Sequence, residues 1–441
     1  MHKFSQTPIE TEVIETNNRI IKTPIPAPST INILKECAKY EPDSMNDQLP
    51  IVWSSAIDYS IYDNAGNKWI DFTSSIFVAN VGHSNPYVSK AIKDTVDKNL
   101  LNAYYYPTSE RAEFSKLLIN LSPKNINKVL FLSTGSEAVE SAIKMAINFT
   151  KRNKVLSFNK AYHGKTMGSS MVCGKGNEWV PVETYVDHIT YPNEWDIPKG
   201  MSDIEFFKFS VKDLNPKDYA AVIAEPYQGW SASFIPKDYA KELRNWCDEN
   251  GILLIIDEIQ SGFGRTGKFF AFEHFDILPD IITCAKGISS SLPLSCVLTR
   301  EEIVNTSMAY NSTHGGNPIA VAASNASVKF LVDNELIKKS EELGYVLNEE
   351  LLKWKNEKPE SIQSINCRGL LASVFIKSPN GNDVDFVDRL IEVAMRKGLM
   401  SVRTMSGTLK IGPPLTITKE ALIEGVKVLK ESLEVCLDTL V

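Results

Sequence analysis

Residues 251–260 read Gly-Ile-Leu-Leu-Ile-Ile-Asp-Glu-Ile-Gln, and this stretch decides the fold class. The unbroken apolar run 252–256 is typical of a strand that is buried on both faces, as in a parallel sheet covered by helices. Asp257 follows the run directly and stands at the carboxyl end of the strand, where open α/β sheets bind ligands. A buried acid needs a cationic partner. Asp257 is therefore either a ligand-binding acid or a cap for the next turn.

Further short apolar runs alternate with helical patterns on both sides of this stretch. We expect strands at 128–132, 154–158, 220–224, 281–283 and 294–299, and helices at 136–151, 236–249 and 317–333. Such an alternation predicts an α/β fold with a mostly parallel sheet covered by helices.

The chain ends have a different pattern. Residues 60–72 resemble a hairpin, and after about residue 335 helices at 338–356 and 384–397 flank a strand at 372–377. We expect a smaller α+β domain there. The predicted division is 1–72 as an N-terminal arm and part of the small domain, 73–334 as the large domain, and 335–441 as the C-terminal small domain.

Composition excludes several classes of protein. The 441 residues are 43% hydrophobic with a net charge of -7, so a nucleic-acid partner is not expected. The N-terminus lacks an apolar signal core, and the chain has no apolar run long enough to span a bilayer. Seven scattered cysteines and six unclustered histidines predict neither disulfides nor a metal site. We expect a cytoplasmic protein without a membrane partner.

The turn Ser133-Thr134-Gly135-Ser136 lies between a predicted strand and a long predicted helix. Thr134 and Glu137 fit a capping box. Free amides at a helix N-terminus suit a phosphate, although the turn could simply be a well-capped helix start. Neither nucleotide-binding glycine fingerprint is present, which argues against a nucleotide-binding α/β protein.

Two further positions fit the same kind of ligand. Tyr162 precedes His163 and Gly164, so its ring could lie flat on a planar ligand or pack within the loop. Lys286 follows a short apolar strand and is flanked by Ala285 and Gly287. A buried lysine has a lowered pKa and is the nucleophilic amine that Schiff-base chemistry needs, whereas most lysines are only solvated. A phosphate site, a stacking aromatic, an acid for a ring nitrogen and this lysine are together what pyridoxal 5′-phosphate (PLP) requires.

Over about residues 40–435 the chain resembles the class III (ornithine/4-aminobutyrate-type) aminotransferases, PLP-dependent enzymes of fold type I. The matching segments are 79–86 (ANVGHSNP), 134–142 (TGSEAVESA), 162–166 (YHGKT), 225–229 (EPYQG), 257–267 (DEIQSGFGRTG), 285–295 (AKGISSSLPLS), 313–318 (THGGNP) and 413–415 (PPL). The resemblance implies a large domain with a mostly parallel seven-stranded sheet and a smaller α+β domain.

The resemblance also implies the residues that bind the cofactor. Gly135 and Ser136 correspond to phosphate-binding residues, and Tyr162 to the aromatic stacked on the ring. Asp257 resembles the partner of the ring nitrogen, and Lys286 the residue that forms the Schiff base.

Other matched positions concern the rest of the site. Gln260 resembles the contact of the cofactor's phenolic oxygen, and Thr313 the residue that reaches the phosphate of the neighbouring subunit's cofactor. Thr313 therefore implies a homodimer with shared active sites. Glu225 resembles an acid that in some members pairs with and masks an arginine. His163 and His83 are interpreted as loop residues or as residues behind the ligands.

Two departures from the family pattern concern the substrate. Lys410 stands where many relatives carry the arginine that binds a substrate carboxylate, and lysine lacks the planar fork of arginine. Lys410 makes a weaker contact, or Arg403 substitutes for it, or the amino substrate has no carboxylate there. Trp230 follows EPYQG, where small or acidic residues are common, and either lines the substrate pocket or packs in the core.

We therefore predict a PLP-dependent aminotransferase that moves an amino group from an amine, amino sugar or amino acid to an oxo acid through a Lys286 Schiff base. An amino-acid racemase or epimerase on the same scaffold is the nearest alternative, because the same lysine can reprotonate the opposite face. A non-catalytic PLP-binding regulator is a more remote one. The identity of donor and acceptor stays open.

Overall fold

The computed structural model describes residues 4–45, 47–104, 106–174, 185–306 and 310–439. The chain forms two compact units, Pro86–Lys338 and the combination of Met1–Asn85 with Lys339–Val441, here called the large and the small unit. The first boundary lies later than the expected 72/73, because residues 73–85 are bonded to the small unit. Within that segment, Ser74 Oγ donates to the Gly412 carbonyl at 2.6 Å, and the Asn80 carbonyl accepts from the Leu415 amide at 2.9 Å.

The large unit is built on a seven-stranded sheet, counted over the described residues. Its strands, in spatial order, are β6 (Lys128–Leu132), β14 (Ser295–Thr299), β13 (Ile281–Cys284), β12 (Leu253–Asp257), β9 (Tyr219–Ala224), β7 (Lys154–Phe158) and β8 (Val186–Ile189). Strand β14 is antiparallel to both of its neighbours, and the other adjacent pairs are parallel. The predicted α/β fold with a mostly parallel sheet is confirmed.

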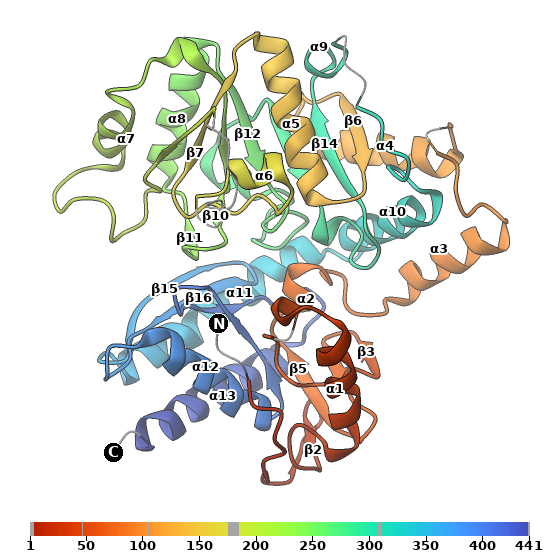
Figure 1. Ribbon diagram of the computed structural model, residues 1–441, viewed down its shortest axis with the longest axis vertical. Helices are drawn as coiled ribbons and strands as arrows, with labels where there is room; N and C mark the ends of the chain where they lie inside the picture. Colours follow the sequence, from red (N-terminus) through yellow and green to blue (C-terminus); the bar gives the residue numbers. More distant parts are fainter. Residues whose placement is uncertain (1–3, 46, 105, 175–184, 307–309, 440–441) are drawn as a thin grey trace. The chain divides into compact units, whose positions relative to one another are not determined.

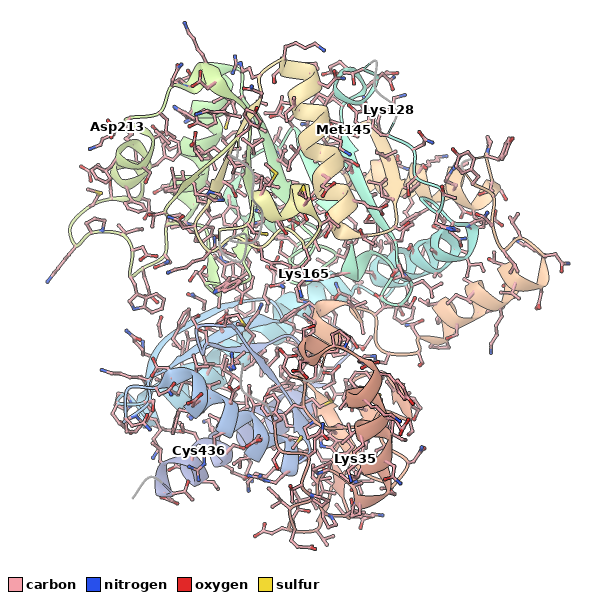
Figure 2. The ribbon with its side chains drawn as sticks, in the orientation of Figure 1. Lys35, Lys128, Met145, Lys165, Asp213 and Cys436 are labelled. Carbon is pink, nitrogen blue, oxygen red and sulfur yellow. The ribbon has the colours of Figure 1, made fainter. Side chains whose placement is uncertain are left out.

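Helices cover this sheet, and α5 lies across its face over β12 and β14 (Figure 1). Met145, labelled on α5 in Figure 2, is fully buried in a core shared with Ile223 and Ile255 of the sheet. The helices of the unit are α3 (Pro86–Asp97), α4 (Ser109–Leu121), α5 (Gly135–Thr150), α6 (Met167–Met171), α7 (Asp203–Val211), α8 (Lys237–Asn250), α9 (Glu301–Val304) and α10 (Pro318–Asp333). Short elements are η3 (Pro216–Asp218), β10 (Tyr227–Gln228), β11 (Ser233–Phe234), η4 (Ala271–Phe275) and η5 (Lys286–Ile288).

Local sequence signals explain where the elements beside the site begin and end. Helix α5 starts with the predicted capping box, in which Thr134 and Glu137 bind each other's backbone. Helix α8 ends at Gly251, whose φ of +61° suits glycine, and the chain turns there into β12. The stretch that predicted the fold is thus a helix stop followed by a fully buried strand.

The small unit is α+β, as predicted. Strands β1 (Ile14–Glu15), β2 (Ile20–Ile21), β5 (Lys68–Asp71), β4 (Ser60–Tyr62) and β3 (Ser55–Ile57) form one sheet, in which β17 (Leu399–Met400) also pairs with β5. Strands β15 (Ile362–Arg368), β16 (Leu371–Ile376), β19 (Leu409–Ile411) and β18 (Val402–Arg403) form a second. Its helices are η1 (Pro28–Thr30), α1 (Ile31–Tyr40), η2 (Asp43–Met45), α2 (Ser74–Phe77), α11 (Leu336–Glu357), α12 (Asp383–Arg396) and α13 (Lys419–Asp438).

The N-terminal arm belongs to this unit. Its strand β2 pairs with β5 through Ile20 and Lys68, and Arg19 forms an ion pair with Glu424 of α13 at 2.7 Å. The predicted hairpin is the β4–β5 pair, whose turn is closed by Asp63 Oδ1 accepting the Ala65 amide at 2.9 Å. Residues from both ends of the chain thus complete one unit.

Candidate active site

Five loops of the large unit follow the carboxyl ends of β6, β7, β9, β12 and β13, and they carry most of the predicted site residues. Loops that leave the carboxyl ends of parallel strands share one edge of the sheet. Because β6 is parallel to β13 through their common antiparallel neighbour β14, its loop reaches the same edge. The fold therefore gathers Gly135, Tyr162, Glu225, Asp257 and Lys286, which are far apart in sequence.

Asp257, the last residue of β12, is buried and is held at both carboxylate oxygens. Its Oδ1 accepts the Ile259 amide at 3.0 Å, and its Oδ2 lies 2.7 Å from Nδ1 of His163. Burial by itself lowers the pKa of His163, but the hydrogen bond and the negative charge of Asp257 outweigh it and raise that pKa. A carboxylate has lone pairs for more than two donors, so Asp257 can accept a further cationic N–H.

Glu225, directly after β9, is a second buried carboxyl group. Its Oε2 accepts the Tyr162 amide and its Oε1 accepts the Gly229 amide, both at 3.0 Å. Burial raises the pKa of Glu225 to about 7, opposed by His163 and reinforced by Asp257. Within the described part of the large unit, main-chain amides rather than an arginine side chain hold this carboxylate.

Lys286 stands just after β13, the strand beside β12. Its φ of 45° is unusual for a residue other than glycine, a kind of strain found mostly at functional sites. Burial lowers the pKa of Lys286, although the charges of Asp257 and Glu225 oppose the change. Among the described residues, no hydrogen-bond or ion-pair partner reaches its amine. A half-buried, unpaired amine with a lowered pKa suits nucleophilic and proton-transfer chemistry.

The N-terminus of α5 has the properties of a phosphate site. Glu137 Oε2 accepts the Ser133 and Thr134 amides at 2.8 and 2.9 Å, and the Glu137 amide donates to Thr134 Oγ1 at 3.2 Å. The amides of Gly135 and Ser136 have no partner in the described part of the chain. They stand at the positive end of a 16-residue helix, where an anion is stabilised.

The loop that carries Tyr162 is held against this helix start. The amide of Lys165, labelled in Figure 2, donates to Ser136 Oγ at 3.2 Å. Gly164 makes the approach possible, since a Cβ there would lie 2.2 Å from Ser136 Oγ. The Tyr162 side chain is 42% exposed and contacts no other aromatic ring among the described residues, so its ring is available to a ligand.

Gln260 and Trp230 lie beside the loop after β9. A Cβ on Gly229 would meet Gln260 Oε1 at 3.0 Å, so this glycine lets the amide side chain approach the backbone. Trp230 is partly buried at the turn between β10 and β11. Thr313 is exposed in a turn, and its neighbour Ser312 donates to Glu137 Oε1 at 3.3 Å, which places that turn near the start of α5.

Two predicted substrate residues belong to the small unit. Lys410 of β19 is buried, and its Nζ lies 4.7 Å from the centre of the Phe77 ring. Phe77 ends α2, a single turn in which Ser74–Phe77 all have positive φ, a left-handed conformation that costs about 1–2 kcal/mol per residue. Arg403 forms a two-bond ion pair with buried Asp388, Nε to Oδ1 at 2.6 Å and Nη2 to Oδ2 at 2.5 Å. This pairing argues against Arg403 as a free carboxylate-binding group.

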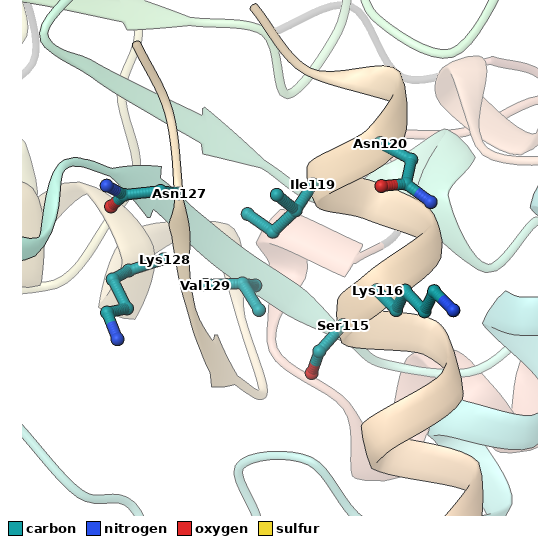
Figure 3. Close-up of a pocket in the computed structure, with 7 residues that line it drawn as sticks. All are labelled: Ser115, Lys116, Ile119, Asn120, Asn127, Lys128 and Val129. Atoms are coloured by element: carbon teal, nitrogen blue, oxygen red, sulfur yellow. The ribbon is translucent and has the colours of Figure 1, made fainter. Parts of the chain in front are cut away.

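The pocket in Figure 3 is separate from these residues. It lies between α4 and β6, has a volume of about 350 Å³, and is lined by Ser115, Lys116, Ile119, Asn120, Asn127, Lys128 and Val129. Lys128 and Val129 begin β6, whereas the turn that precedes Gly135 follows the carboxyl end of that strand. The pocket thus contains none of the predicted site residues.

The groups described in the large unit have the chemical character that PLP requires. Two unpartnered amides at a helix start suit its phosphate, the Tyr162 ring its planar face, and the Asp257 carboxylate its ring nitrogen. No cluster of three or more potential metal ligands occurs among the described residues. In the same part of the chain, the helices are too short or too polar to cross a bilayer.

Comparison with known proteins agrees with this chemistry. Residues 43–433 match the family model for class-III aminotransferases. An acetylornithine aminotransferase from Methanopyrus kandleri is 37% identical over 320 residues, covering 71% of this chain and 78% of the relative. A leucine/methionine racemase from Thermococcus litoralis is 35% identical over 402 residues, covering 87% and 90%.

Solved structures agree as well. An S-selective transaminase from Bacillus megaterium superposes with a TM-score of 0.85 at 26% identity, covering 92% of this chain and 97% of that structure. This likeness confirms the predicted fold type I. The chain belongs to the class III aminotransferases and is a PLP-dependent aminotransferase.

Proposed function

We propose that the amino group passes from a primary amine, amino sugar or neutral amino acid to a 2-oxo acid such as 2-oxoglutarate or pyruvate, with Lys286 as the reacting amine. The observation that carries this proposal is the half-buried amine of Lys286, which has no hydrogen-bond or ion-pair partner among the described residues and is influenced by the charges of Asp257 and Glu225. An amine held in this way is ready to bind a carbonyl carbon and to carry a proton.

Each neighbouring residue has a separate task in this proposal. PLP, when bound, supplies an aldehyde and an electron-withdrawing ring. The Gly135 and Ser136 amides bind its phosphate, the Tyr162 ring covers its plane, and Gln260 donates to its phenolic oxygen. Asp257 balances the positive charge of its ring nitrogen. Lys286 Nζ would take up and return the proton of the substrate carbon.

Lys286→Ala tests this assignment. Wild-type protein with PLP should show a visible absorption band and transfer an amino group, whereas the variant should lose both. The matched control is Lys212→Ala, because Lys212 is an exposed residue at the end of α7. Undiminished amino transfer by the Lys286 variant would contradict the proposal.

The substrate is proposed at the level of its class. Lys410 supplies one cationic group without the fork of arginine, and Glu225 and Trp230 are proposed to face the substrate. Arg403 is assigned to the ion pair with Asp388 instead. A matrix of amine donors and oxo acids, followed by the visible spectrum, would identify the preferred pair.

Racemisation is the second candidate function, favoured by the 35% identity with the leucine/methionine racemase. A single amino acid incubated with the protein and no oxo acid separates the two functions. Inversion of the α-carbon under these conditions indicates a racemase, whereas conversion of the cofactor without inversion indicates an aminotransferase.

We also propose a cytoplasmic homodimer in which Thr313 reaches the phosphate of the partner subunit's cofactor. Exposure of Thr313 in a turn supports this proposal. Mixing subunits that carry Lys286→Ala with subunits that carry Thr313→Val tests it. In a shared-site dimer each active site would combine Lys286 of one subunit with Thr313 of its partner, so the outcome depends on whether the two substitutions fall in the same active site. If Thr313 acts across the interface, both lesions fall in one site of the mixed dimer, and the other site regains activity.

A further inference from the structure

We propose that Glu140, in the second turn of helix α5, is a positioning residue that holds the Tyr162 ring in place over the plane of the cofactor. The inference rests on the proposed function, because it uses the place given there to Tyr162. It adds a residue that binds neither cofactor nor substrate in that proposal and acts on the cofactor through the loop after β7.

Two side chains of α5 hold the loop that carries Tyr162. Ser136 and Glu140 lie on the same face of α5, because residues four apart in a helix stand one above the other. Ser136 Oγ accepts the Lys165 amide at 3.2 Å, and Glu140 Oε1 accepts the Thr166 hydroxyl at 2.5 Å. The helix whose start is proposed to bind the phosphate therefore also holds the loop of the stacking aromatic.

Glu140 also caps the short helix that follows this loop. Figure 1 shows α6 beside α5, and Glu140 Oε1 accepts the amides of Gly168 and Ser169 at 2.9 and 3.3 Å. An N-cap side chain normally binds these amides, but within the described part of the chain Thr166, the N-cap residue of α6, makes no such bond. A helix of five residues is not stable by itself, so the cap from α5 fixes its start.

Two glycines make the loop both close-fitting and pliable. A Cβ on Gly168 would lie 3.0 Å from Cγ and from Cδ of Glu140, so the missing side chain lets the carboxyl group reach the backbone. Gly164 has a φ of +140°, a conformation that glycine adopts without strain. The chain between Tyr162 and Thr166 can therefore bend at Gly164 unless both of its ends are held.

The ends of this segment are held from different sides. Glu225 Oε2 accepts the Tyr162 amide at 3.0 Å, and Glu140 holds Thr166. The Tyr162 ring is 42% exposed and contacts no other aromatic ring among the described residues, so its position follows that of the backbone. Loss of Glu140 leaves Ser136 as the described side chain of α5 that binds this segment, through one bond of 3.2 Å.

The test is a double-mutant cycle between Glu140 and Tyr162, with the dissociation constant of PLP as its readout. Glu140→Ala removes the three bonds, whereas Glu140→Gln keeps a side-chain oxygen that can accept them. The matched control is Glu205→Ala. Glu205 closes a capping box at the start of α7, where its Oε2 accepts the Ser202 amide at 2.8 Å, and α7 carries none of the predicted site residues.

For Glu140→Ala we expect PLP affinity to fall about tenfold, since each lost hydrogen bond contributes about 2- to 10-fold. When Tyr162→Ala is already present, the same change should lower affinity less than about twofold, because the ring that it positions is gone. Glu140→Gln should recover most of the affinity, and Glu205→Ala should leave it unchanged.

Two results overturn the inference. One is wild-type PLP affinity in Glu140→Ala. The other is an equal loss of affinity with and without the Tyr162 ring, because Glu140 would then act on the start of α5 or on the whole fold. If Tyr162→Ala by itself leaves PLP affinity unchanged, the place given to Tyr162 is wrong and the inference falls with it.

A second variant covers a Glu140→Ala protein that does not fold. Thr166→Val removes one donor to Glu140 and leaves the α6 amides in place. It should lower PLP affinity about threefold in the presence of Tyr162 and have no effect in Tyr162→Ala, and equal effects in the two proteins overturn the inference.

The inference and the proposed function fail separately, because PLP affinity is measured without any substrate. A protein with the expected coupling between Glu140 and Tyr162 that transfers no amino group refutes only the proposed function. Normal amino transfer without this coupling refutes only the inference.

Discussion

The buried carboxyl group of Glu225 predicts a stability that changes with pH in a defined direction. Its pKa is about 7 in the folded protein, against 4.5 for an ordinary glutamate. Between these values the folded chain binds more protons than the unfolded chain, so stability falls as the pH rises through this window. The contribution is fully present below about pH 4.5 and is lost above about pH 7.

The magnitude follows from the same two pKa values. At about 1.4 kcal/mol for each tenfold change in an equilibrium constant, ionised Glu225 destabilises the fold by about 1 kcal/mol at pH 5 and about 3 kcal/mol at pH 8. Glu225→Gln resembles the protonated acid, since its amide oxygen can still accept one of the two backbone amides. Glu225→Gln should therefore be more stable than wild type, and the difference in unfolding free energy between the two proteins should be about 2.5 kcal/mol larger at pH 8 than at pH 5.

Urea unfolding of the cofactor-free protein at several pH values measures this difference. All samples should have the same protein concentration, because the stability of an oligomer depends on its concentration. Glu249→Gln, at an exposed position on α8, is the matched control and should show no such trend. Buried Glu258 also has a pKa of about 7, but it is present in every variant and cancels in the comparison. A stability difference between wild type and Glu225→Gln that is constant with pH would refute the reasoning.

Three other predictions concern the α5 cap and the small unit. Thr134→Ala should lower the unfolding free energy by about 1 kcal/mol and weaken PLP binding, because the capping box is lost. A thermal melt and a PLP titration that both match wild type would argue against this. Arg403→Leu should destabilise the protein by about 3–5 kcal/mol by leaving Asp388 buried and unpaired, whereas Arg403→Leu combined with Asp388→Leu should recover much of the loss. If a correctly folded double variant loses its affinity for carboxylate substrates, Arg403 binds substrate after all. Lys410→Arg should lower KM for α-amino acid donors about tenfold through a two-bond carboxylate contact, and unchanged KM values would show that Lys410 does not determine specificity.

Much of the site could be predicted from local patterns. The turn at Gly135 was recognisable from a strand, a capping box and a helix, and the structure has this order. Asp257 was recognisable because it follows an apolar run that could only be a buried strand. Lys286 was a weaker prediction, because an exposed lysine after a strand would have had the same sequence pattern.

Other features depended on long-range contacts. The bond between His163 and Asp257 joins residues 94 positions apart, and a histidine after an aromatic residue carries no local sign of its partner. The engagement of Arg403 with Asp388 depends on how β18 lies along α12. Strand β8 was not predicted, because its sequence Val-Asp-His-Ile mixes apolar and polar residues at the end of the sheet.

By itself, the sequence determined the α/β class, the order of the strands along the chain, and which residue types could hold PLP. These follow from periodicity, caps and apolar runs, which act between neighbours in the chain. Only the tertiary structure decided the electrostatic state of the site. It raised the pKa of Glu225 and lowered that of Lys286 by burial, and it brought His163 to the acid that follows residues 251–256. A pKa depends on the solvent and charges that surround a group in space, and the chain sets these only once it is folded.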